Sequence, residues 1–342
     1  MHPTDVIAVV GSCPAERSRA AASLANETGS MLLTATRIAM SPAPIHEALA
    51  LVPWAHREGR AVVEFPSATS MTGLIGALCD DGQETARLIG ITCVVDAVHL
   101  LDDLRRDDYF VRYGLHGERG YARALTAVEQ IEFASTVLLV NWEPLSTPNL
   151  SAIMAVVTHL SPRARLQLDR SGIERAVEPM AYSAEQERPG WVAILNDEFD
   201  PHITDPRVTA LRYEQLRPMH PERLERLLDG DFSSGRHGTV LRSAGFCRLA
   251  SRPRLTAKWE HVGRMFSLHP LAVDDEVEAG IDAGEEALGF GQDIAVIGID
   301  LDRDGLIAAL DAAALTDEEF AAGPEFWAGL SDPFPVSHPS AP

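Results

Sequence analysis

The sequence lacks any long run of apolar residues. No uninterrupted apolar stretch approaches the roughly 20 residues that a helix needs to cross a bilayer. It also lacks a basic segment ahead of its first apolar run, Val6–Val10. The sequence therefore predicts neither a membrane-spanning helix nor a secretory signal peptide.

Cysteine is scarce, and several metal and catalytic motifs are missing. The four cysteines are widely spread and form no CxxC pair. This pattern suits a reducing cytoplasm better than a disulfide framework, so a cytoplasmic location is expected. The histidines form no HxH or HExxH pattern, and there is no GxSxG elbow. Neither a zinc-protease motif nor a hydrolase triad is indicated.

Positive charge is in short supply, with 29 Lys and Arg against 50 Asp and Glu and a formal net charge of −21. Such a surface repels phosphate backbones, so general nucleic-acid binding is disfavoured, whereas a cationic protein partner stays open. Acidic residues concentrate in Asp274–Glu286, which has no periodic apolar face and is predicted to be a solvated loop. The carboxylate pairs Asp102-Asp103 and Asp107-Asp108 are also expected to be solvated.

The first half alternates short apolar runs with longer helical patterns. The apolar runs are continuous, as in strands covered by helices on both faces. The expected strands are Val6–Val10, Ala61–Phe65, Thr92–Val95 and Val137–Val140. The expected helices are Ala15–Ala25, Ile45–His56, Met71–Cys79, Tyr121–Phe133 and Asn149–Leu160. This alternation predicts a mostly parallel sheet with right-handed crossovers.

The pattern breaks at Glu185–Gly190, which places a domain boundary near 180–205. The second half is predicted to be a smaller α/β or α+β domain. Its expected strands are Val208–Leu216, Thr239–Leu249 and Asp293–Ile299, and its expected helices run from Pro221 to about Gly230 and over Arg303–Ala313.

A phosphate-loop frame, G-x-x-x-x-G-K-[ST], can be laid over Gly11–Ser18, between the first strand and the first helix. Gly11 and Ser18 fit the frame, whereas Glu16 replaces the second glycine and Arg17 replaces the lysine. Glu16 adds a negative charge where phosphates would lie, and Arg17 keeps a positive one. Two interpretations remain open: an altered phosphate loop, or a strand–turn–helix joint without a ligand.

Further motifs in both halves occur in the order known from one family. They are VVDAVHLL at 94–101, VEQIEFAS at 128–135, VLLVNWEP at 137–144, RPMHPERL at 217–224, RSAGF at 242–246 and the segment from Asp300 to Trp327 with its LTDEE turn. The chain resembles the CobW family of nucleotide-binding metallochaperones. The resemblance implies an α/β, P-loop NTPase-like domain over residues 1–200 and a smaller α/β CobW C-terminal domain over 205–332.

Several positions depart from the family's nucleotide site. The NKxD motif becomes Asn141-Trp142-Glu143-Pro144, so Pro144 replaces the aspartate that would read guanine. Trp142 could stack on a base, but stacking alone does not select guanine. The resemblance implies that cofactor-binding residues, for GTP or ATP with Mg²⁺, are Gly11, Arg17, Ser18, Glu64 and Asn141. For Glu64 and Asn141, a purely local structural role is the alternative.

The family's metal motif is also absent. Its CxCC-like cysteines would fall at Ala39–Pro42, where no thiolate stands, so a soft tetrahedral zinc site is not expected there. His46 and Glu47 follow, and they could equally be helix-start residues.

Three functions stay open. The favoured function is that of a binding or recruitment protein. NWEP and the C-terminal half resemble an actinobacterial branch of the family, whose members are made when zinc is scarce and recruit a ribosome hibernation factor to the small subunit. The second is a GTP- or ATP-dependent zinc metallochaperone acting on a client protein. The third is a diverged paralogue with neither activity. No catalytic residue is predicted, and the partner is expected to be a protein rather than a membrane.

Overall fold

The computed structural model describes residues 3–57, 59–80, 82–114, 117–170, 182–183, 187–273 and 291–335. The chain divides into two compact units. Unit 1 comprises Met1–Gly190 with Asp200–Thr204, and unit 2 comprises Trp191–Phe199 with Asp205–Pro342. The acidic segment Asp274–Glu286, predicted to be a solvated loop, lies outside the described residues.

Unit 1 is built on a six-stranded sheet in the order β2-β3-β1-β4-β7-β8, and every neighbouring pair is parallel. Its strands are β1 (Thr4–Val10), β2 (Met31–Leu33), β3 (Arg60–Glu64), β4 (Ala86–Asp96), β7 (Thr136–Val140) and β8 (Arg165–Leu168). A separate antiparallel hairpin consists of β5 (Tyr109–Gly114) and β6 (Gly117–Ala122). The parallel sheet confirms the α/β class expected from the continuous apolar strands.

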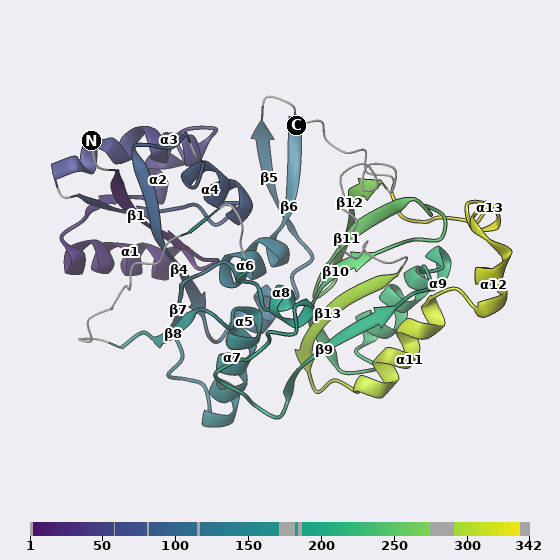
Figure 1. Cartoon of the computed structure of the whole chain (residues 1–342). Coiled ribbons are helices and arrows are strands. Elements are labelled where there is room, and N and C mark those ends of the chain that lie inside the picture. The colour runs from purple at the N-terminus through teal and green to yellow at the C-terminus, as the bar shows by residue number, and fades with distance from the viewer. Residues whose placement is uncertain are drawn as a thin grey trace. The chain divides into compact units, whose positions relative to one another are not determined.

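Helices flank this sheet on both sides (Figure 1). They are α1 (Pro14–Thr28), α2 (Ala35–Ile38), α3 (Pro44–Leu51), the 3₁₀ turn η1 (Val52–Arg57), α4 (Met71–Leu78), α5 (Leu100–Asp103), α6 (Arg123–Glu132) and α7 (Thr147–Leu160). Ile7 and Val9 pack with Leu24 of α1 in one buried cluster. The alternate strand residues Val6 and Ala8 are buried as well, so both faces of β1 are covered.

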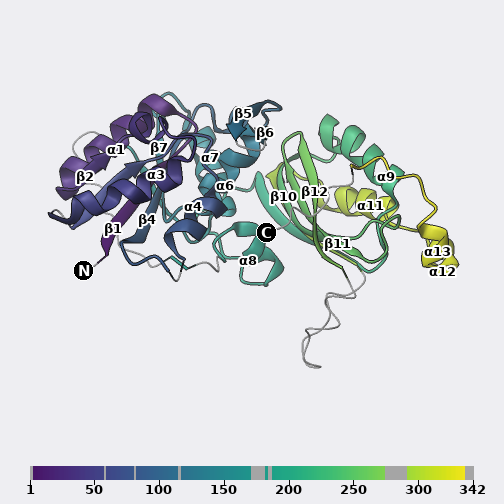
Figure 2. The same cartoon turned by 90° about the horizontal axis from the view of Figure 1, so that it is seen from above.

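Unit 2 holds a five-stranded antiparallel sheet in the order β12-β11-β10-β13-β9. Its strands are β9 (Val208–Gln215), β10 (Thr239–Cys247), β11 (Leu255–Val262), β12 (Met265–Val273) and β13 (Gln292–Ile299). Its helices are α8 (Gly190–Leu195), α9 (Pro221–Arg226), the π-helical turn η2 (Leu227–Phe232), α11 (Arg303–Ala313), α12 (Asp317–Ala322) and α13 (Pro324–Trp327). The first residue of α8, Gly190, belongs to unit 1, and the rest of that helix belongs to unit 2. The α9 and α11 helices lie side by side on one face of the sheet (Figure 2).

The core of unit 2 lies between that face and the helices. Leu211, Trp259 and Ile294 of the sheet pack with Leu224 of α9 and Leu310 of α11. An antiparallel sheet covered by helices on one face is an α+β arrangement, which selects between the two alternatives left by the sequence. Within the described residues, no helix is both long and apolar enough to cross a membrane.

Candidate functional site

The residues singled out from the sequence gather where the parallel strands of unit 1 end. Gly11 follows β1, Glu64 is the last residue of β3, and Asn141 follows β7, while Arg17 and Ser18 lie in the first turns of α1. In open α/β sheets, ligands bind outside the carboxyl ends of the strands, where successive crossovers turn in opposite directions. The fold therefore places these five residues at the edge where a ligand is expected.

Gly11 lets the loop after β1 pass close to β4. Its φ is +146°, a backbone conformation that side chains rarely allow, and a Cβ at this position would lie 2.2 Å from the carbonyl oxygen of Val94. Cys13 sits at the start of α1 and its thiol lies 3.4 Å from the same Val94 oxygen. Burial, with a smaller contribution from the charge of Glu16, raises the pKa of this thiol to about 12, so Cys13 stays protonated at neutral pH.

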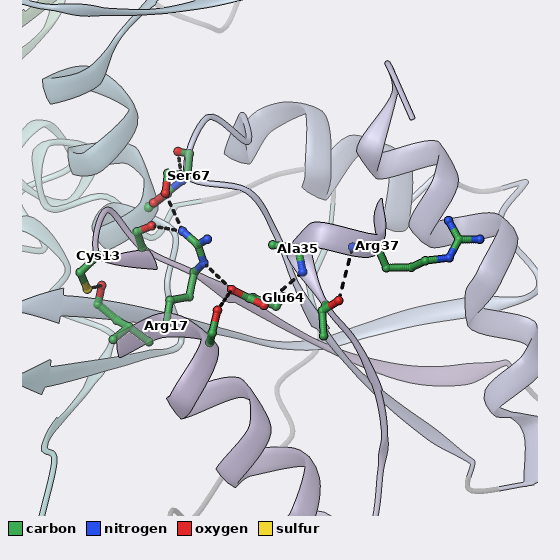
Figure 3. A network of polar contacts seen from close by, with 11 residues as sticks. Cys13, Arg17, Ala35, Arg37, Glu64 and Ser67 are labelled. Atoms are coloured by element: carbon green, nitrogen blue, oxygen red, sulfur yellow. Dashed lines mark hydrogen bonds and ion pairs between the residues drawn. The ribbon is translucent and has the colours of Figure 1, made fainter. Parts of the chain in front are cut away.

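Arg17 is buried, and its guanidinium donates hydrogen bonds to other residues of unit 1. Its Nε donates to Glu64 Oε1 over 3.1 Å, and its Nη1 donates to the Gly11 carbonyl over 2.7 Å and to Ser67 Oγ over 2.6 Å (Figure 3). Only 4% of Arg17 and 2% of Glu64 are exposed. The cation that replaces the phosphate-binding lysine is thus neutralised by an internal carboxylate.

Glu64 accepts three hydrogen bonds from its own protein. Besides Arg17, its Oε1 accepts from Ser18 Oγ over 2.6 Å, and its Oε2 accepts from the backbone N–H of Ala35, the first residue of α2, over 3.1 Å. Ser18 is one of the residues that the family resemblance implies for a nucleotide with Mg²⁺, but here its hydroxyl donates to Glu64. As arranged here, the groups that would hold a triphosphate and its metal satisfy one another, so the residues do not fit that ligand without rearrangement.

Asn141 takes part in a second polar cluster. Its backbone is left-handed, with φ +54°, and its Nδ2 donates to Asp96 Oδ2 over 2.8 Å. The His99 ring lies 3.1 Å from the other oxygen of Asp96. Burial alone would raise the pKa of Asp96, but the hydrogen bonds from Asn141 and His99 outweigh burial and lower it. The amide of Asn141 thus makes a local contact with a carboxylate, and its contact with a nucleotide stays a prediction.

Trp142 is engaged as well. Its indole N–H donates to the carbonyl of Asp169 over 2.9 Å, and the guanidinium of Arg170 lies 5.6 Å from the ring centroid. The indole edge is therefore fixed by the segment after β8, and one face of the ring is shared with a cation.

No metal centre is visible in the part of the chain that the structure describes, where no group of three or more His, Cys, Asp or Glu could hold an ion. Ala39–Pro42 follow α2 and carry no thiolate. Glu47, which was singled out from the sequence together with His46, pairs with Arg37 over 3.0 Å. Ala39–Pro42 therefore supply no thiolate for a zinc ion.

Sequence reasoning missed three members of this region. Ser67 and the amide of Ala35 complete the network around Arg17 and Glu64, and Asp96 anchors Asn141. Asp96 could have been found from its place at the end of the VVDA strand, since strand ends carry the sites of such sheets. Nothing in the local sequence marks Ser67 or Ala35.

The fold is a parallel α/β unit followed by an antiparallel unit, and the loop after β1 keeps Gly11 and Ser18 of the phosphate-loop frame. Residues 208–314 match the family model described as "Cobalamin synthesis protein cobW C-terminal domain". This match confirms the resemblance to the CobW family and shows that unit 2 carries a CobW C-terminal domain.

Individual proteins resemble the chain over a longer stretch. It is 24% identical over 289 residues to "Zinc-regulated GTPase metalloprotein activator 1" of Dictyostelium discoideum, a match that covers 78% of this chain and 60% of that protein. The chain thus spans less than two thirds of the length of that relative. Among solved structures, the Zn(II)-bound YjiA GTPase of E. coli is 14% identical with a TM-score of 0.36, over 92% of this chain and 100% of the other. A Zn(II)-bound triple mutant of YjiA is 14% identical with a TM-score of 0.39 over the same shares.

Proposed function

We propose that this chain is a CobW-like protein whose degenerate nucleotide site is closed by its own side chains, and that it acts in the cytoplasm as a binding or recruitment protein linked to zinc starvation. It would be a recruitment protein of the kind that brings a ribosome hibernation factor to the small subunit. The buried pair between Arg17 and Glu64 carries the proposal, because it engages the cation that phosphate would need.

The energetic cost of opening this site supports the proposal. A phosphate that takes the guanidinium of Arg17 away from Glu64 would leave that side chain as a buried carboxylate without its cation. Breaking a buried pair in this way costs about 3–5 kcal/mol. A Kd of about 10 μM corresponds to roughly −7 kcal/mol in all. Opening would consume about half of that free energy, so nucleotide affinity should be weak.

The link to zinc draws on a relative. The name of the Dictyostelium protein describes it as zinc-regulated and as a metalloprotein activator. A related role in zinc homeostasis for this chain agrees with that name. The missing thiolates at Ala39–Pro42 argue against direct zinc sensing at that motif and leave protein contacts as the means of action.

The same name favours a second candidate, a GTP- or ATP-dependent zinc metallochaperone with weak NTPase activity. In that case Gly11 and Arg17 would contact the phosphates, Ser18 and Glu64 would serve Mg²⁺, and Asn141 would lie near the base. A client protein would then be the partner.

Nucleotide calorimetry with a Glu64→Gln variant separates these two candidates. For the wild type we expect no binding of Mg²⁺-GTP or Mg²⁺-ATP tighter than about 10 μM. Glu64→Gln removes the charge that holds Arg17, so it should bind nucleotide more tightly than the wild type if the site is closed. If Glu64 serves Mg²⁺, the wild type should bind tightly and the variant should bind less.

Asp5→Asn is the matched control. It removes one carboxylate from the other end of β1, where Asp5 pairs with Arg87 on the surface, and should leave nucleotide binding unchanged. Thermal melts of all three proteins show whether each variant is folded. Tight binding by the wild type that Glu64→Gln weakens would replace our first candidate by the second.

Recruitment is tested by affinity purification from zinc-starved cells of the source organism, with zinc-replete cells as the control. We expect small-subunit ribosomal proteins or a hibernation factor to be enriched only under starvation. Repeated enrichment of a zinc enzyme, with both of those absent, would favour the metallochaperone.

A further inference from the structure

A small pocket opens beside the loop after β1, between that loop, the end of α5 and the start of α6. Its cavity volume is about 30 Å³, room for a few water molecules, and it opens to solvent. The residues that define its chemistry are Ser12, Ser67, Asp103, Arg106, Phe110 and Arg123. All of them belong to unit 1.

Two arginines in this pocket are held in place by one carboxylate outside it. Asp108 accepts from Nε and Nη2 of Arg106, both over 2.8 Å, and lies 2.9 Å from Nε of Arg123. The guanidinium of Arg123 also stacks on Phe110, 4.0 Å from the ring centroid. Stacking and ion pairing fix the direction of a guanidinium fork, which is the geometry that binds carboxylate or phosphate oxygens in pairs.

The arginines keep donors for a ligand. Arg123 is one of the lining residues, and within the described residues its terminal nitrogens make no hydrogen bond to the protein. Ser67 accepts from Arg17, which leaves its own hydroxyl proton for another acceptor. The pocket thus offers two guanidinium groups and one hydroxyl.

One acidic group opposes them. Asp103 lines the pocket, but its Oδ2 accepts from Ser12 over 2.7 Å and its Oδ1 lies 3.9 Å from Arg106. Counted with Asp108, which pairs with both arginines, two positive charges face two negative charges, so attraction for an anion depends on the directed donors and not on net charge. The net charge of −21 on the whole chain weakens the attraction for any anion. Binding should therefore be weak and sensitive to salt.

We propose that this pocket binds a small oxyanion the size of phosphate. The observation that carries it is the pair of oriented arginines beside a serine that can still donate. The pocket is too small for a whole nucleotide. It borders the phosphate loop through Ser12 and the closed network through Ser67, but its arginines are Arg106 and Arg123 and not Arg17, so the two proposals are tested separately. The oxyanion could be a free phosphate ion or the terminal phosphate of a nucleotide, since both present the same oxygens.

The test is a titration of inorganic phosphate into the full chain, followed by the ³¹P line width at constant ionic strength. We expect saturable broadening at millimolar concentration. Arg123→Gln should weaken it about tenfold or more, the effect of one lost charge-assisted hydrogen bond. Arg106→Gln serves as a second variant should Arg123→Gln unfold. Arg87→Gln is the control, because that arginine is exposed and lies near the opposite end of β4.

A second arm adds Mg²⁺-GTP to the phosphate complex. Displacement of phosphate would support the pocket with a nucleotide phosphate as its occupant and would contradict the closed loop. Binding of phosphate that GTP does not displace would support the pocket with the free ion. No saturable broadening in the wild type, or equal broadening in Arg123→Gln and Arg87→Gln, would overturn the pocket and leave the closed loop untouched.

Discussion

Replacing Arg17 by methionine is expected to lower the free energy of unfolding of unit 1 by about 3–5 kcal/mol. The substitution leaves Glu64, which is 2% exposed, as a buried carboxylate without its cation. It also removes the hydrogen bonds to the Gly11 carbonyl and to Ser67. Urea denaturation followed by circular dichroism measures the change, and each transition is fitted separately because the two units can unfold independently.

Two comparisons make this prediction specific. The double variant Arg17→Met/Glu64→Leu should be more stable than Arg17→Met alone, since removing both charges removes the unpaired one. Arg87→Met breaks the surface pair with Asp5, where 64% of the arginine side chain is exposed, and should cost no more than about 1 kcal/mol. A loss below that value for Arg17→Met would mean that Glu64 reaches water, and the closed site would have to be abandoned.

The second large effect concerns acid stability and depends on His261 in β11. Burial, with a smaller contribution from the charge of Arg242, lowers the pKa of His261 from 6.5 to about 4. Between those values the unfolded chain binds a proton that the folded chain does not. Stability is therefore complete above pH 6.5 and falls as the pH drops toward 4, by up to about 3 kcal/mol in total. The measurement is urea denaturation of unit 2 at several pH values from 7.5 to 5.

His261→Phe isolates this contribution from that of the carboxylates. Phenylalanine keeps the edge contact that the His261 ring makes with Phe232, whose centroid is 5.2 Å away, and it cannot titrate. The variant should lose less stability than the wild type on acidification. His269→Gln, an exposed histidine on the neighbouring strand, should behave as the wild type does. Identical pH dependence in all three proteins would show that the pKa of His261 is the same in the folded and the unfolded chain.

The sequence predicted best those strands and helices whose burial follows from their own local apolar pattern. The continuous apolar runs at Val6–Val10 and Val137–Val140 are central strands, and the helix expected at Arg303–Ala313 is α11. Short edge strands were missed, since β2 has three residues and β8 is the half-exposed Arg165–Leu168. The β11 strand was also missed, because it carries Lys258 and Glu260 among its apolar residues. Glu260 is buried with two cations beside it, Lys258 on the same strand and Arg242, eighteen residues earlier.

The site was less predictable than the fold. The motifs pointed to Arg17 and Glu64 as site residues. The contact between the two could not be predicted, because it joins residues 47 positions apart and depends on the packing of α1 against β3. Asp103 was predicted to be solvated, and this was wrong: its side chain is 20% exposed and accepts from Ser12. Whether any of the five expected residues contacts a nucleotide stays a prediction.

One bond around Glu64 links the loop to a more distant segment. The carboxylate that holds Arg17 also accepts from the amide of Ala35, so the start of α2 is tied to the same charge as the start of α1. Any event that draws Glu64 away must release both helices together. The amide proton of Ala35 is therefore a natural reporter of the loop, protected from solvent exchange while Arg17 is held and exchanging when it is released.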